Sequence, residues 1–226
     1  MRIKPGRATA CAMHGFVFWL DFLGVAVFAA TGALTASRKQ LDIVGFMLLA
    51  AVTGIGGGTL RDLLIGRPVF WIGQPVYIAV TTGVALLVFF TAHRLESRFR
   101  VLLWLDAMGL SLFCAMGADI ALAQGTPASV AVLMGTMTAT CGGLIRDIVC
   151  AEVPLVLRRE IYVTAAALGA LVFVGLSALG AGPDASLIAA AAACFAIRGL
   201  ALWHGWSLPA YRPRPGRDYP PGGAAG

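Results

Sequence analysis

Apolar residues occur along this chain in long runs, separated by short stretches that hold most of the charged residues. A run of about 20 apolar residues, at roughly 1.5 Å per residue, is long enough to cross the hydrocarbon core of a membrane as an α-helix. Such runs cover residues 16–36, 43–60, 76–92, 101–123, 128–145, 161–179 and 185–203. The pattern therefore predicts an all-α membrane protein with seven transmembrane helices.

Composition agrees with this class, since 59% of the residues are hydrophobic and 12% are charged, against roughly 45–50% and about 25% in soluble proteins. The net charge of +6 comes from linkers and tails rather than from one amphipathic face, which argues against a nucleic-acid partner. The five cysteines lie mostly within or beside apolar runs, and the three histidines are far apart. The sequence therefore predicts no disulfide framework, no metal site and no cofactor.

Basic residues are concentrated on one side of the predicted helices. The first, third and fifth linkers and the C-terminal tail contain Arg38, Lys39, Arg94, Arg98, Arg100, Arg158, Arg159, Arg212, Arg214 and Arg217. The opposite side contains Arg2, Lys4, Arg7 and Arg67. Because Lys and Arg favour the cytoplasmic side of a bacterial inner membrane, this distribution predicts an outside N-terminus and a cytoplasmic C-terminus.

The two ends of the chain carry separate expectations. Residues 1–15 are expected to form an outside tail rather than a signal peptide, because the apolar run that follows is long for a signal sequence. Met13 is an alternative start that the sequence leaves open. Residues 208–226 are rich in Pro, Arg and Gly, which predicts a disordered cytoplasmic tail.

The chain contains an internal repeat at an offset of 85 residues. Aligned at this offset, Asp21 pairs with Asp106, Arg61 with Arg146, and Tyr77 with Tyr162; charged and aromatic matches of this kind do not arise easily by chance. Each half, residues 16–92 and 101–180, holds three predicted helices. Since three is odd, the second half enters the membrane from the opposite face, and the repeats are inverted. A seventh helix, residues 185–207, has no partner.

Each half carries the same glycine motif at the end of its second helix. The first copy runs from Thr53 through Gly56, Gly57 and Gly58; the second runs from Thr138 through Gly142 and Gly143. Glycine weakens a helix interior, so the motif predicts a kink or a break in the second and fifth helices. Backbone opened in this way is tolerated where it lines a water-filled path. The alternative is close helix packing, since Gly54 and Gly58 also form a GxxxG pair.

Charged residues follow the glycines in both copies. Arg61 and Arg146 lie one turn beyond the glycines, and a charge within a membrane needs a partner or water. Asp21 and Asp106 are the expected partners, because they lie near the same ends of the neighbouring helices. Asp62 and Asp147 are weaker candidates, because adjacent residues do not face each other on a helix. The alternative is that these pairs only hold the helices together.

The motif excludes several other activities. It lacks the lysine of a phosphate-binding P-loop and the βαβ context of a dinucleotide site, so it does not predict nucleotide binding. Asp21 and Asp106 are expected at opposite membrane faces, which argues against an aspartyl protease, and no enzyme activity is predicted. Arginines favour an anion path, but the carboxylates of Asp21, Asp106 and Asp119 outnumber them and favour a cation.

The doubled motif of two glycines, two other residues, arginine and aspartate resembles the prokaryotic branch of the trimeric intracellular cation (TRIC) channel family, whose bacterial members are also described as glycine-transporter-domain proteins. The resemblance covers roughly residues 16–209, although Cys141 replaces the first glycine of the second copy. It implies a homotrimer with one pore per subunit, kinked at the glycines and permeable to K⁺ and Na⁺; a bound lipid is left open. The alternatives are a secondary transporter of a small amino acid such as glycine, or a membrane scaffold.

Overall fold

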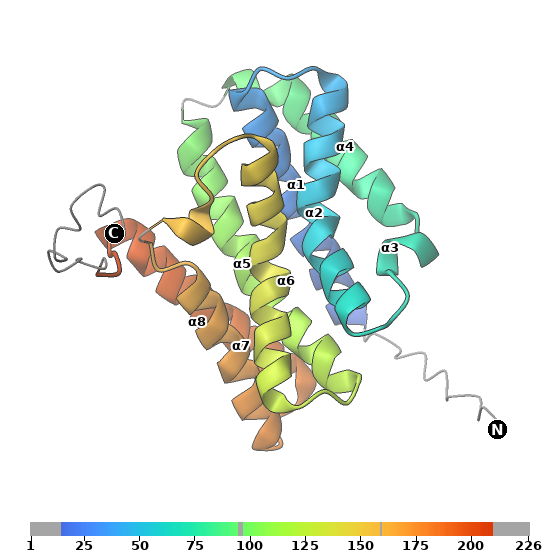
Figure 1. Cartoon of the computed structure of the whole chain (residues 1–226), viewed down its shortest axis with the longest axis vertical. Helices are drawn as coiled ribbons and strands as arrows, with labels where there is room; N and C mark the ends of the chain where they lie inside the picture. Colours follow the sequence, from blue (N-terminus) through green and yellow to red (C-terminus); the bar gives the residue numbers. More distant parts are fainter. Residues whose placement is uncertain (1–14, 95–96, 159, 210–226) are drawn as a thin grey trace, which may run out of the picture.

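The computed structural model describes residues 15–94, 97–158 and 160–209, which form a bundle of helices (Figure 1). The long helices are α1 (Gly15–Arg38), α2 (Ile43–Leu64), α4 (Val76–Thr91), α5 (Arg98–Ala123), α6 (Ala128–Val149), α7 (Val163–Ala178) and α8 (Pro183–His204). Each corresponds to one of the seven apolar runs, so the predicted fold class is confirmed. Six are long and apolar enough to cross a membrane, α4 when counted with the turn that continues it to Arg94, and α7 is a shorter apolar helix.

Short helices connect some of the long ones. These are α3 (Phe70–Gly73) and the 3-10 turns η1 (Ala92–Arg94) and η2 (Leu155–Leu157). The sequence pattern did not predict them, because one helical turn is too short to show a period. The first predicted tail lies outside the described residues except for Gly15, as does the alternative start at Met13, and only Leu208 and Pro209 of the second tail are described.

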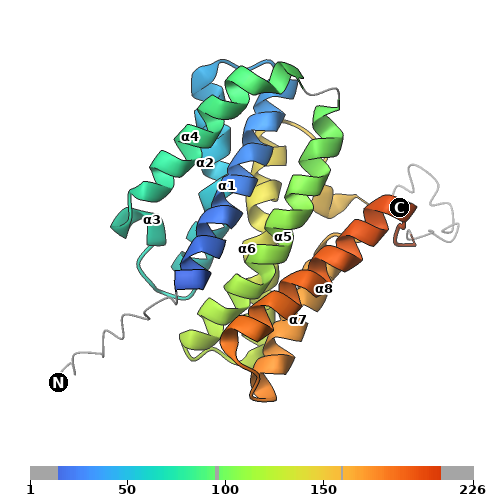
Figure 2. The same cartoon turned by 180° about the vertical axis from the view of Figure 1, so that it is seen from behind.

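The two halves of the repeat pack through equivalent helices. In the centre of the bundle, α1 packs on α5 and α2 packs on α6. The remaining helix of the first half, α4, covers α1 and α2, while α7 and α8 cover the second half (Figures 1 and 2). Successive long helices run in opposite directions, as the inverted repeat requires. The core therefore lies along the line where the two halves meet.

Two phenylalanines mark the symmetry of this contact. The rings of Phe28 in α1 and Phe113 in α5 stack with centroids 5.4 Å apart. Each ring also lies over a glycine of the opposite helix: a Cβ added to Gly109 would come 2.9 Å from Phe28, and one added to Gly24 would come 3.0 Å from Phe113. The small residues of the repeat therefore make room for the large residues of the other half.

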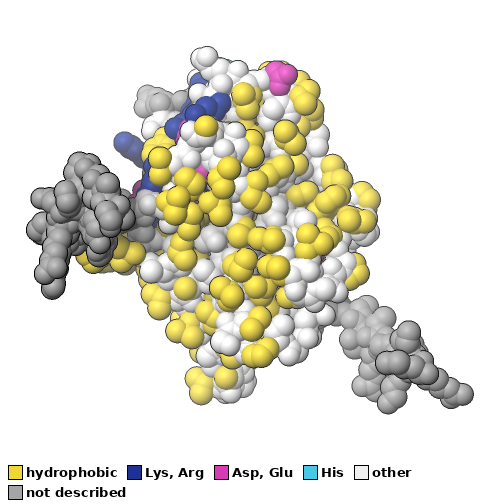
Figure 3. All heavy atoms as spheres, in the orientation of Figure 1, with side chains coloured by type: hydrophobic (Ala, Val, Ile, Leu, Met, Phe, Trp, Pro, Cys, Tyr) yellow, Lys and Arg dark blue, Asp and Glu magenta, His cyan; other side chains and the backbone are white. Residues whose placement is uncertain are grey.

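The outer surface is apolar over the length of the helices. Figure 3 shows hydrophobic side chains spread over this face, with Lys and Arg gathered at one end. Large exposed side chains include Leu48, Leu87, Phe90 and Leu171. Monomeric soluble proteins rarely expose contiguous apolar surface of this kind. The surface therefore fits a protein that spans a membrane.

Candidate functional site

The glycines of the two motifs meet where α2 crosses α6. A Cβ added to Gly57 would overlap the backbone carbonyl oxygen of Thr138, and one added to Gly142 would overlap the carbonyl oxygen of Thr53. After these threonines, the nearest residue to each added Cβ is the other glycine: the backbone nitrogen of Gly142 lies 3.5 Å from a Cβ on Gly57, and that of Gly57 lies 3.9 Å from a Cβ on Gly142. Only residues without a side chain allow two helix backbones to approach this closely. The repeat therefore places its two glycine motifs against each other in the centre of the subunit.

Neither helix is broken at these glycines. Both α2 and α6 continue as α-helix through the glycines, to Leu64 and Val149 respectively. The predicted break is therefore wrong, and the close-packing alternative describes what these two glycines do here. The reason is that the approach of the second helix stabilises each glycine segment, so its low intrinsic helix propensity does not decide its conformation. A bend of the helix axis stays a prediction.

The other glycines of the motif face side chains rather than backbone. A Cβ at Gly56 would lie 3.2 Å from Ile145, and one at Gly58 would lie 2.7 Å from the ring of Phe70. A Cβ at Gly143 would face three polar groups, the hydroxyl of Tyr162, the carboxylate of Asp106 and the guanidinium of Arg146. Gly143 therefore connects the crossing to the charged cluster of the second half.

The two threonines of the motif are buried in the same crossing. Thr53 donates its hydroxyl hydrogen to the carbonyl oxygen of Leu49, and Thr138 donates to that of Met134, each over 2.6 Å. Their hydroxyl groups therefore bond within their own helices, while their backbone carbonyl oxygens face the glycines of the opposite helix.

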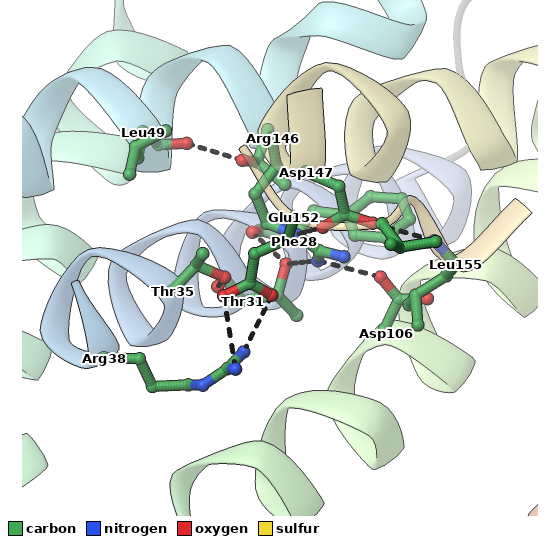
Figure 4. Close-up of polar contacts among 12 residues, drawn as sticks. Phe28, Thr31, Thr35, Arg38, Leu49, Asp106, Arg146, Asp147, Glu152 and Leu155 are labelled. Atoms are coloured by element: carbon green, nitrogen blue, oxygen red, sulfur yellow. Dashed lines mark hydrogen bonds and ion pairs between the residues drawn. The ribbon is translucent and has the colours of Figure 1, made fainter. Parts of the chain in front are cut away.

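Arg146 is held by side chains from three helices. Its Nη1 lies 2.9 Å from Asp106 in α5 and donates over 2.9 Å to the hydroxyl of Thr31 in α1. Its Nε donates over 2.8 Å to Asp147, the next residue in α6. Figure 4 shows Asp106, Asp147 and Thr31 around this side chain. The predicted pair of Arg146 with Asp106 is confirmed, and Thr31 is a partner that the sequence did not reveal.

Arg61 is paired differently from its equivalent. Its Nε and Nη2 lie 2.9 Å and 2.8 Å from a carboxylate oxygen of Asp62, the next residue in the chain. Asp21 instead accepts a hydrogen bond from the hydroxyl of Tyr77. The predicted pair of Arg61 with Asp21 is therefore wrong among the residues that the structure describes. The repeat alignment paired Tyr77 with Tyr162. This recurrence was the sequence feature that could have identified Tyr77 as the partner of Asp21.

The aspartates after the arginines are held by the segments that follow α2 and α6. The second carboxylate oxygen of Asp62 accepts from the backbone N–H of Phe70 over 3.0 Å, and that of Asp147 accepts from the N–H of Leu155 over 2.9 Å. The expectation that Asp62 and Asp147 are weaker partners is therefore wrong. Phe70 begins α3 and Leu155 begins η2, so the first N–H of the next helical element fixes each carboxylate where the long arginine side chain can reach it.

The two clusters differ in the partners that reach each arginine. Thr31 supplies a hydroxyl acceptor to Arg146, whereas the equivalent position in the second half is Met116, which supplies none. Both arginines bond their adjacent aspartate, and among the described residues Arg146 alone of the two also bonds a threonine hydroxyl and a second aspartate. In the first half Asp21 bonds Tyr77 instead.

Both clusters are taken out of contact with solvent. The exposed fraction is 0% for Arg146 and 1% for Asp106, and it is 4% for Arg61 and 0% for Asp62. Breaking a buried ion pair by removing one partner costs about 3–5 kcal/mol, because the other charge is left uncompensated. These residues therefore fix the helix arrangement as well as placing charge inside the bundle.

Comparison with protein families identifies related chains. The family model described as "Glycine transporter" matches the chain twice, over residues 18–93 and 103–178, so the two matches are offset by 85 residues. A UPF0126 membrane protein of Vibrio cholerae is 38% identical over 200 residues, which cover 86% of this chain and 82% of that protein. The UPF0126 inner membrane protein YadS of Escherichia coli is 39% identical over 159 residues, 69% of this chain and 76% of that one.

Solved structures also match this chain. The TRIC trimeric intracellular cation channel orthologue from Rhodobacter sphaeroides is 52% identical, with a TM-score of 0.84; the match covers 85% of this chain and 100% of that one. A prokaryotic TRIC channel crystallised in 0.5 M KCl is 30% identical, with a TM-score of 0.81; the match covers 87% of this chain and 100% of that one. The expected resemblance is therefore confirmed in sequence and in fold.

Proposed function

Because this chain belongs to the glycine-transporter family of UPF0126 membrane proteins, we propose that it is a monovalent cation channel of the inner membrane, conducting K⁺ and also Na⁺. The likeness to the Rhodobacter sphaeroides cation channel orthologue carries this proposal. Its physical support is the charge buried beside the crossing of α2 and α6. There, Asp21, Asp62, Asp106 and Asp147 outnumber the buried Arg61 and Arg146 by two formal charges, of which Arg67, 3.8 Å from Asp62, offsets one. An excess of carboxylates favours cations over anions.

The ion path in this proposal follows α2 and α6 past their crossing. The two backbones touch at Gly57 and Gly142, so ions pass beside the crossing rather than between the helices at that point. Gly56, Gly58 and Gly143 add no side chains of their own there, while Ile145 packs against Gly56 and Phe70 against Gly58. Thr53 and Thr138 add polar backbone at the same depth. The two arginine clusters lie on opposite sides of this level and set the electrostatic profile of the path.

Single-channel recording in planar bilayers tests the proposal. In a KCl gradient, a cation channel gives unitary currents whose reversal potential approaches the equilibrium potential of K⁺ rather than that of Cl⁻. Gly57→Leu should reduce the conductance, because the new side chain forces α2 and α6 apart beside the path. Gly83→Leu is the matched control, since a Cβ at Gly83 in α4 meets nothing within 4 Å. Equal conductance of the two variants would show that the glycine motif does not line the ion path.

A secondary transporter of a small amino acid is the second candidate, and the description of the matching family model favours it. Inverted repeats with a central glycine motif suit a transporter as well. Saturable uptake of labelled glycine into proteoliposomes, without unitary currents in bilayers, would support this candidate and overturn the channel. Unitary currents that carry ions far faster than a transporter turns over would support the channel and overturn the transporter.

The assembly and orientation are parts of the same proposal. The subunit forms a homotrimer with one path in each subunit, in keeping with the trimeric Rhodobacter sphaeroides orthologue. Light scattering after size exclusion in detergent measures this state, and a monomer or dimer mass would contradict it. The N-terminus lies outside and the C-terminus in the cytoplasm. A green fluorescent protein fused after Gly226 should therefore fluoresce, whereas an alkaline phosphatase fused there should be inactive.

A further inference from the structure

A cavity of about 660 Å³ lies between α5 and α8, at the end of the bundle where α5 begins and α8 ends. Figure 2 shows the two helices diverging toward this end. The cavity is lined by residues of both helices, among them Phe99, Arg100, Leu103, Trp104, Leu202 and Trp203. Its volume is within the range of ligand pockets, about 300–1,000 Å³. None of its lining residues belongs to the glycine motifs or to the two arginine clusters.

The helix outside the repeat makes one wall of this cavity. On α8, a Cβ built on Gly199 would lie 3.4 Å from the Trp104 ring, and the ring of Phe195 lies 6.2 Å from that of Trp104. Trp203, one turn after Gly199, is 80% exposed. In the first half Trp19 is the repeat equivalent of Trp104, and it is 72% exposed. The cavity therefore depends on the packing of α8 against the second half.

Basic side chains surround one end of the cavity. Arg100 lines it and is exposed, and the guanidinium groups of Arg38 and Arg158 lie 4.8 Å and 5.4 Å from the centre of the Phe99 ring. Glu152 pairs with Arg38, whereas the ion pairs of the described residues include neither Arg100 nor Arg158. The cavity therefore places positive charge beside an apolar wall.

This lining selects a ligand that has an anionic group and an apolar part. A guanidinium group binds a phosphate through two parallel hydrogen bonds, so Arg100 suits a phosphate. The apolar side chains of the wall offer contacts that a free phosphate cannot use, namely Leu103, Trp104, Leu202 and Trp203. A zwitterionic lipid would bring its cationic group among the same guanidinium groups and be repelled. An anionic lipid uses both parts of the lining.

We propose that this cavity binds an anionic phospholipid, with its phosphate at Arg100 and the first part of an acyl chain against Trp104 and Leu202. The level is that of lipid headgroups, because α5 begins there and α8 ends there. In the orientation proposed above, it faces the cytoplasmic leaflet, where basic pockets between transmembrane helices bind anionic headgroups. The site is independent of whether the chain is a channel or a transporter, because it depends on α5 and α8 rather than on the glycine motifs.

Native mass spectrometry of the full-length protein tests the ligand. The protein is released from detergent micelles that contain equal amounts of phosphatidylglycerol and phosphatidylcholine, and the lipids that stay bound are counted by mass. We expect phosphatidylglycerol to be retained several-fold more often, and Arg100→Gln to remove this preference. Arg94→Gln is the matched control, because Arg94 is also exposed but does not line the cavity. Equal retention of the two lipids, an unchanged preference in Arg100→Gln, or an equal loss in both variants would overturn the proposal.

Quenching of tryptophan fluorescence by brominated lipids locates the lipid in vesicles. The vesicles hold phosphatidylglycerol and phosphatidylcholine in one fixed ratio, and bromine is carried by the acyl chains of either the first or the second. One variant keeps Trp104 and the control keeps Trp19, with the other tryptophans replaced by Phe. We expect the ratio of quenching by brominated phosphatidylglycerol to quenching by brominated phosphatidylcholine to be several-fold higher at Trp104.

Two outcomes of the quenching measurement contradict the site. Equal ratios at Trp104 and Trp19 would mean that Trp104 meets only bulk lipid. Absence of quenching at Trp104 by either lipid would mean that another subunit fills the cavity. The mass measurement uses the unchanged protein and a single substitution, so the proposal stays testable if a variant with one tryptophan does not fold.

Discussion

Replacing Gly57 by Ala tests whether the motif serves the close crossing of α2 and α6. The added Cβ would fall well inside the 3.0 Å at which real Cβ contacts end, against the carbonyl oxygen of Thr138. That oxygen belongs to the backbone of α6 and cannot turn away as a side chain would. The two helices must therefore separate, and the contacts along their interface weaken together.

The magnitude follows from two opposing effects. Overpacking of a tight interface costs about 1–3 kcal/mol, while Ala in place of Gly in a helix returns about 0.5–1 kcal/mol. We expect a net loss of roughly 1–2 kcal/mol, which in a chain of this size lowers Tm by about 2–8 °C. Gly142→Ala should give a similar loss, because its Cβ would meet the carbonyl oxygen of Thr53 in the same way.

Thermal unfolding in detergent, followed with a thiol-reactive fluorescent dye, provides the assay. The dye reports unfolding because the free cysteines of the described chain are all buried, namely Cys114, Cys141, Cys150 and Cys194. Cys11, which lies outside the described residues, is replaced by Ala in every sample. Gly83→Ala and Gly175→Ala are the controls, since a Cβ at either position meets nothing within 4 Å. A Tm of Gly57→Ala equal to that of Gly83→Ala would refute the close-crossing explanation.

Two further predictions concern the ion pairs and a loop. A double-mutant cycle on Asp106 and Arg146, which lie 2.9 Å apart, should give a coupling of about 0.5–3 kcal/mol, whereas Asp21 and Arg61 should be additive within about 0.5 kcal/mol; equal couplings would mean that the halves are paired alike. Ala151 has a left-handed backbone conformation, with φ of 50°, which costs free energy because of its Cβ. Ala151→Gly should therefore stabilise the protein by about 0.5–1 kcal/mol. A lower Tm of this variant in the dye assay would contradict that reasoning.

Much of the fold could be predicted from hydrophobicity because the membrane imposes it. A span in lipid must satisfy its backbone within one helix and must be about 20 residues long, so each apolar run had one possible structure. The repeat was equally accessible, since Asp21, Arg61 and Tyr77 recur at a fixed offset. The short α3 was not accessible, because a single turn leaves no periodic signal.

The candidate site was predicted in its residues but only partly in its contacts. The pair of Arg146 and Asp106 followed from their places near the same helix ends. The pair of Arg61 and Asp62 did not, because it depends on the N–H of Phe70, at the start of the unpredicted helix α3, which holds the carboxylate. Thr31 was missed because it reaches Arg146 from the other half of the repeat.

The sequence by itself determined that this chain crosses a membrane, that it is built from two inverted halves, and which glycines and charges recur. Only the tertiary structure decided what those residues do. Gly57 and Gly142 were expected to open their helices, and instead each receives the backbone of the other helix. The reason is that intrinsic propensity is a local property, whereas the contact that overrides it comes from a segment 85 residues away, which the fold alone brings to the same place.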